Sequence, residues 1–242
     1  MTRGGIVLVA ALAACAGSPQ PAARPSSEAQ ALFLAGDYRG AMAGFEREGG
    51  GASARLSVAL CLIKLDRPRD AVAALQALAG SVQPPDVTLR IQLSLAEAHA
   101  MTGDATASLR AAQAAERAAE RRPGSVARDE FLFVTGCAHL RMGRAEGRAR
   151  LRELIELEPR SSLAAEAALR LQVTGFGVRV GDAVEPHAPP PVAGGISCRL
   201  VRVDTDGVTR IFALMDGLTT YQQAHTLAGK LRRTGVSVGV LP

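Results

Sequence analysis

The sequence ALFLAGDYRGAMAGF at residues 31–45 places a Gly-Asp break between two apolar, alanine-rich segments. A glycine readily ends a helix in the left-handed conformation, and an aspartate can cap the helix that follows. Comparable breaks occur at Asp66-Arg67, Gly103-Asp104 and Gly143-Arg144, at spacings of 30, 37 and 40 residues. Recurrence at this period predicts a repeated helix–turn–helix unit whose copies stack into a solenoid.

The first unit resembles a tetratricopeptide repeat in its Gly-Asp-Tyr turn and in the positions of Ala41 and Phe45. Small residues are needed where paired helices cross, and they are expected at Ala41, Ala71 and Ser108 and at Ala59, Ala96 and Gly136. In the fourth unit Arg148 stands at the small position. The resemblance implies an α-solenoid of about four hairpins over residues 28–173, capped by a helix from Ser161-Ser162 to about Val173. An irregular all-α domain is the alternative.

Composition agrees with close-packed helices, because aromatic residues make up only 3% of the chain and tryptophan is absent. The formal net charge of +5 is mild and spread along the chain. A nucleic-acid-binding protein normally concentrates its positive charge in a patch, so no nucleic-acid partner is expected.

The N-terminus predicts export and a lipid anchor. Arg3 precedes an apolar run that is too short to span a bilayer, as is typical of a signal peptide. The run ends in Leu12-Ala13-Ala14-Cys15, which resembles the lipobox of bacterial lipoproteins and implies lipidation of Cys15. Residues 1–15 are then the signal peptide and 16–27 a flexible tether, and Ala16 favours the periplasmic face of the outer membrane. The alternative is an ordinary cleaved signal with a chance cysteine.

Solenoids usually bind peptides or proteins in a concave groove formed by the first helix of each pair. Polar residues on those helices are therefore candidates for partner contacts, namely Arg55, Lys64, Arg90, Gln92 and Arg141. The alternative is that each of them is an ordinary solvated surface residue.

Residues 174–242 predict a separate small α+β domain. The expected order is a strand at 176–180, a proline-rich loop, a hairpin of strands 196–204 and 208–215 around Asp206-Gly207, a helix capped by Thr219 or Thr220 and ending near Arg233, and a last strand at 236–241. Asp206-Gly207 is a strong signal for a two-residue hairpin turn. This prediction is much better supported than a calcium-binding loop at the same residues.

Residues 209–224, with Leu227, Leu231 and Gly235, resemble the second half of a SPOR domain. The resemblance implies a ferredoxin-like sheet with helices on one face that binds peptidoglycan glycan strands lacking stem peptides. It is partly degenerate, because residues 214–218 depart from the family pattern and a loop replaces the first helix. If the helix packs on Ile211, Ala213 and Met215, the opposite face exposes Arg210, Phe212 and Leu214. These three are the candidate glycan-binding residues; an ordinary solvated sheet face is the alternative.

No catalytic motif, metal-ligand spacing or cofactor fingerprint occurs in a suitable setting, so we expect no enzyme, metal or cofactor. Cys61, Cys137 and Cys198 are isolated and are expected as thiols, with Cys61 and Cys137 buried in helices. A disulfide, which an exported protein's compartment permits, is the alternative. The sequence therefore predicts an envelope lipoprotein that acts as an adaptor for a protein or peptide, with peptidoglycan as a second ligand. The alternative is an accessory factor for outer-membrane assembly, division or cell-wall remodelling whose tail no longer binds glycan.

Overall fold

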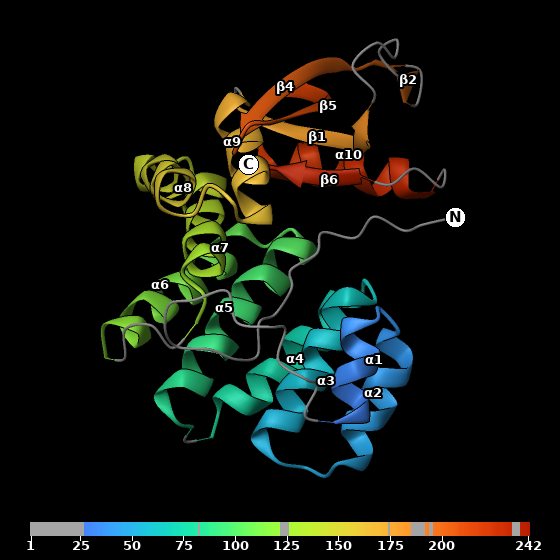
Figure 1. Cartoon of the computed structure of the whole chain (residues 1–242), viewed down its shortest axis with the longest axis vertical. Helices are drawn as coiled ribbons and strands as arrows, with labels where there is room; N and C mark the ends of the chain where they lie inside the picture. The colour runs from blue at the N-terminus through green and yellow to red at the C-terminus, as the bar shows by residue number, and fades with distance from the viewer. Residues whose placement is uncertain are drawn as a thin grey trace. The chain divides into compact units, whose positions relative to one another are not determined.

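The computed structural model describes residues 27–81, 83–121, 126–173, 175–184, 192–193, 196–233 and 238–242 (Figure 1). The protein is mostly helical and has a four-stranded antiparallel sheet toward its C-terminus. The described residues form two compact units, the N-terminal unit (27–134) and the C-terminal unit (135–242), which divide within helix α7 (Arg128–Arg141). The predicted signal peptide, with Cys15, lies outside the described residues.

Paired helices make up the N-terminal unit as predicted. They are α1 (Glu28–Leu34), α2 (Tyr38–Arg47), α3 (Ala52–Lys64), α4 (Pro68–Ala79), α5 (Pro85–Thr102), α6 (Ala105–Arg121) and the start of α7. Helix α1 begins with a serine cap, because the backbone N–H of Gln30 donates to Ser27 Oγ at 3.2 Å. Each of α2, α3, α4 and α5 packs against the helix before it and the helix after it.

The four predicted breaks share one turn geometry. Gly36, Asp66, Gly103 and Gly143 all have positive φ angles. In the first break the N–H of Asp37 donates to the Leu32 carbonyl at 3.0 Å, and that of Gly36 to the Phe33 carbonyl at 3.1 Å. The same two bonds recur at the other three breaks, so each helix ends in a Schellman motif. The breaks are thus local signals that the sequence analysis identified correctly.

The small residues that the sequence predicts at the helix crossings are buried. Exposed fractions of 0–1% are found at Ala41, Ala59, Ala71, Ala96 and Ser108. Ser108 Oγ also donates to the Ala96 carbonyl at 2.8 Å, which satisfies the one polar side chain of the set. Ala29, which the sequence analysis missed, lies seven residues before Gly36, as Ala59 does before Asp66. It packs so closely that a Cβ on Gly44 would lie 2.7 Å from the Ala29 Cβ.

In the fourth pair the prediction placed the small position one residue too late. A Cβ on Gly147 of helix α8 (Ala145–Leu157) would lie 2.6 Å from the Leu140 backbone nitrogen and 2.7 Å from the Gly136 carbonyl oxygen. Gly147, not the position of Arg148, is therefore the close crossing point. The Arg148 guanidinium instead donates to the Leu171 carbonyl in the next helix. A bulky side chain is tolerated at 148 because Gly147, and not residue 148, is the position of α8 that contacts the α7 backbone.

The C-terminal unit continues through α8, α9 (Ser162–Gln172) and a small α+β fold. Its other elements are β1 (Phe176–Val184), β2 (Val192–Ala193), β3 (Ile196–Ser197), β4 (Arg199–Thr205), β5 (Val208–Leu218), α10 (Tyr221–Arg233) and β6 (Val238–Leu241). The sheet has the order β4-β5-β1-β6, and β2 pairs only with β3. The predicted strand at 196–204 is interrupted at Cys198, where pairing changes from β2 to β5. Asp206 and Gly207 both have positive φ angles, as the predicted two-residue hairpin requires.

Helices cover both faces of the sheet. Helix α10 packs on one face, over a core of Val178, Val180, Cys198, Ala213, Met215, Ala224, Ala228 and Leu231. Helix α9 lies on the other, over a core of Ala165, Leu169, Val173, Val201, Val203, Phe212, Leu214 and Leu241. The sequence predicted α9 only as a cap for the helical stack. It does pack against α8, but its other side closes the sheet (Figure 1).

Candidate functional site

The predicted glycan-binding face is not exposed. Phe212 and Leu214 are 4% and 1% exposed beneath α9. Arg210 is half-buried, and its Nη1 donates to Thr205 Oγ1 at 3.2 Å. The expectation of an open face was wrong because it considered only the tail's own helix as cover. The missed signal was the apolar stripe of Ala165, Leu169 and Val173, whose residues recur every four positions on α9.

A buried charge network joins α9 to the sheet. Glu166 Oε2 accepts from Arg170 Nη1 at 2.7 Å, and Glu166 Oε1 lies 3.7 Å from Arg179 Nη1 of β1. The Arg179 guanidinium carbon lies 5.8 Å from the centroid of the Phe212 ring. Burial alone would raise the pKa of Glu166, but the two guanidinium charges outweigh it and hold that pKa below its ordinary value. The network fixes α9 over the same face that the sequence offered as a glycan site.

Among the predicted groove residues, Arg55, Lys64 and Gln92 remain available to a partner. Arg55 is exposed on α3, and Lys64 and Gln92 are half-buried on α3 and α5. We call these three residues the candidate contact residues; Arg55 and Lys64 lie nine residues apart on α3 and therefore on opposite sides of that helix. Their exposure leaves both of the original alternatives open, a partner contact or a solvated surface.

Arg90 is not a surface residue, so its assignment to an exposed groove was wrong. Its Nη1 donates to Glu130 Oε1 of α7 at 2.6 Å, and the two residues are only 9% and 8% exposed. Arg90 lies thirteen residues before Gly103, and Glu130 lies thirteen residues before Gly143. Residues at the same distance before two successive turns therefore meet, and their charges neutralise each other between α5 and α7.

Arg141 also has an intramolecular role. Its guanidinium carbon lies 5.5 Å from the ring centroid of Tyr221, at the start of α10. The Tyr221 ring in turn lies 6.0 Å from that of Phe176 and 6.3 Å from that of His225. A cation over an aromatic ring contributes most when it is desolvated, and both side chains here are largely shielded from solvent. Arg141 thus holds the end of α7 against α10.

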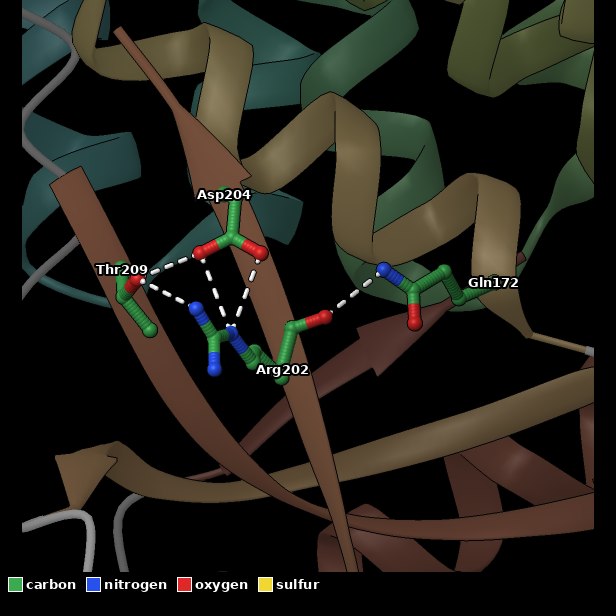
Figure 2. Close-up of polar contacts among 4 residues, drawn as sticks. All are labelled: Gln172, Arg202, Asp204 and Thr209. Carbon is green, nitrogen blue, oxygen red and sulfur yellow. Dashed lines mark hydrogen bonds and ion pairs between the residues drawn. The ribbon is translucent and has the colours of Figure 1, made fainter. Parts of the chain in front are cut away.

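A polar cluster that the sequence analysis did not assign lies on β4 and β5. Figure 2 shows the Arg202 side chain between Asp204 and Thr209, with Arg202 Nε 3.1 Å from Asp204 Oδ2 and Arg202 Nη2 3.2 Å from Thr209 Oγ1. Thr209 also donates to Asp204, and Gln172 Nε2 donates to the Arg202 carbonyl at 2.9 Å. The hydrogen bonds from Thr209 and Arg202 lower the pKa of Asp204.

This cluster satisfies the polar groups of an edge strand. Strand β4 ends the sheet on one side, and an edge strand with free backbone groups invites pairing with another chain. Charged side chains at Arg202 and Asp204, together with the Gln172 amide on the Arg202 carbonyl, discourage such pairing. The alternation of charged and apolar residues along 199–205 is the sequence signal for it.

The three cysteines that the structure describes offer no accessible nucleophile. Cys61, Cys137 and Cys198 are free thiols and all are buried. Burial raises the pKa of the Cys61 thiol to about 12, so almost none of it is thiolate at neutral pH. Over the part of the chain that the structure describes, no three His, Cys, Asp or Glu side chains gather as a metal site would require.

Comparison with known proteins adds no family to this geometry. No family model matches the sequence, and no curated protein matches it. Within the described ranges, no helix has both the length and the apolar character needed to cross a membrane. A function must therefore be inferred from the helix pairs, the covered sheet and the candidate contact residues.

Proposed function

We propose that this chain is a cell-envelope lipoprotein that acts as a non-enzymatic adaptor and binds a protein or peptide through tetratricopeptide-like helix pairs. The observation that carries the proposal is the repeated packing geometry, with a Schellman turn at each break and small residues at equivalent crossing positions. Helix pairs that stack on their neighbours in this way form extended surfaces suited to peptides and proteins. Cys15 would anchor the chain at the periplasmic face of the outer membrane.

The covered sheet favours the version of this function in which the tail does not bind glycan. Opening the α9-side face would expose Leu169, Phe212 and Leu214, among other apolar side chains. At about 1.5–3 kcal/mol for each large side chain, the cost is on the order of 10 kcal/mol. That is comparable to the whole stability of a typical domain. An accessory role in outer-membrane assembly, division or wall remodelling is thus the second candidate.

The partner surface can be tested by site-specific photo-crosslinking in the native envelope. A crosslinking amino acid replaces Arg55 on α3 in one variant, and Arg69 on α4, which is equally solvent-exposed, serves as the matched control. We expect a defined adduct from position 55 that is absent from position 69. Equal adducts from both positions, or none from position 55, would contradict the proposed surface.

The anchor and the glycan question need separate measurements. Cys15→Ser should move the protein from the membrane fraction to the soluble periplasmic fraction and abolish incorporation of labelled fatty acid.

A soluble form spanning 16–242 should remain in the supernatant with both intact and amidase-treated peptidoglycan sacculi. Sedimentation with the treated sacculi alone would restore glycan binding as a function of the tail.

A further inference from the structure

No further inference is drawn: the strongest candidate, the exposed side-chain cluster of Arg202, Asp204 and Thr209 on the β4–β5 half of the sheet, carries nothing because its polar atoms bond to one another and no second observation at the cluster points to a ligand.

Discussion

At the scale of single residues, Glu166 of α9 is a largely buried carboxylate in the C-terminal unit. Its carboxylate lies between the guanidinium groups of Arg170 and Arg179. Glu166→Gln removes the negative charge from this buried network. Breaking a buried ion pair from one side costs about 3–5 kcal/mol. We expect a loss of that size in the unfolding free energy at pH 7, measured by urea denaturation. Glu156→Gln, at an exposed position of α8, is the control and should change stability by less than about 0.5 kcal/mol.

The same residue predicts a pH dependence. Because the folded-state pKa of Glu166 lies below its ordinary value of 4.5, its contribution is fully present above the unfolded-state pKa. The contribution is lost as the pH falls through the folded-state value. The stability gap between the wild type and Glu166→Gln should therefore be constant near neutrality and shrink below about pH 4.5. A gap that is unchanged across this range would contradict the assignment of this stability difference to the charge of Glu166.

The buried cysteine thiols are expected to react slowly with alkylating reagents. Cys61 is fully buried and the pKa of its thiol is raised to about 12, so both access and ionisation oppose alkylation. In the native protein, iodoacetamide at pH 8 should leave Cys61, Cys137 and Cys198 unmodified, whereas all three should react in urea. Peptide mass spectrometry measures this directly. Rapid native labelling of Cys61 would mean that α3 opens locally on the experimental timescale.

At the scale of single elements, close helix crossings should tolerate no added atoms. Gly147→Ala would place a Cβ against the backbone of α7, at distances that only a shift of α8 could relieve. We expect a loss of about 1–3 kcal/mol in unfolding free energy. Gly229→Ala in α10 is the matched control, because nothing lies within 4 Å of its added Cβ. Removing a helix-interior glycine there should stabilise the protein by about 0.5–1 kcal/mol. Equal changes in unfolding free energy for the two variants would show that helix propensity, and not packing against α7, determines the effect of Gly147→Ala.

The turns and the sheet cover show which elements could be predicted from the sequence. A Schellman turn depends on a few adjacent residues, so Gly36, Asp66, Gly103 and Gly143 could be recognised locally. The hairpin at Asp206-Gly207 was predictable for the same reason. The cover over Phe212 was not, because α9 and β5 meet only in the folded chain, and each carries an apolar stripe that could have met other partners. The pairing of Arg90 with Glu130 is likewise a contact between distant segments, and either residue alone looks like a surface charge.

At the scale of the whole molecule, α9 and the sheet that follows it share one hydrophobic core. Helix α9 contributes Ala165, Leu169 and Val173 to the layer over β4 and β5, so a fragment of residues 174–242 would lose that layer and expose Phe212 and Leu214. We expect a fragment of residues 126–242, which keeps α7, α8 and α9, to unfold cooperatively and to give dispersed amide resonances. The fragment 174–242 should instead aggregate or give a collapsed spectrum. The domain boundary predicted at 173 would be correct if the shorter fragment folded alone with comparable stability. If it does not, α9 and the sheet form one cooperative folding unit, and the C-terminal unit cannot be divided at residue 173.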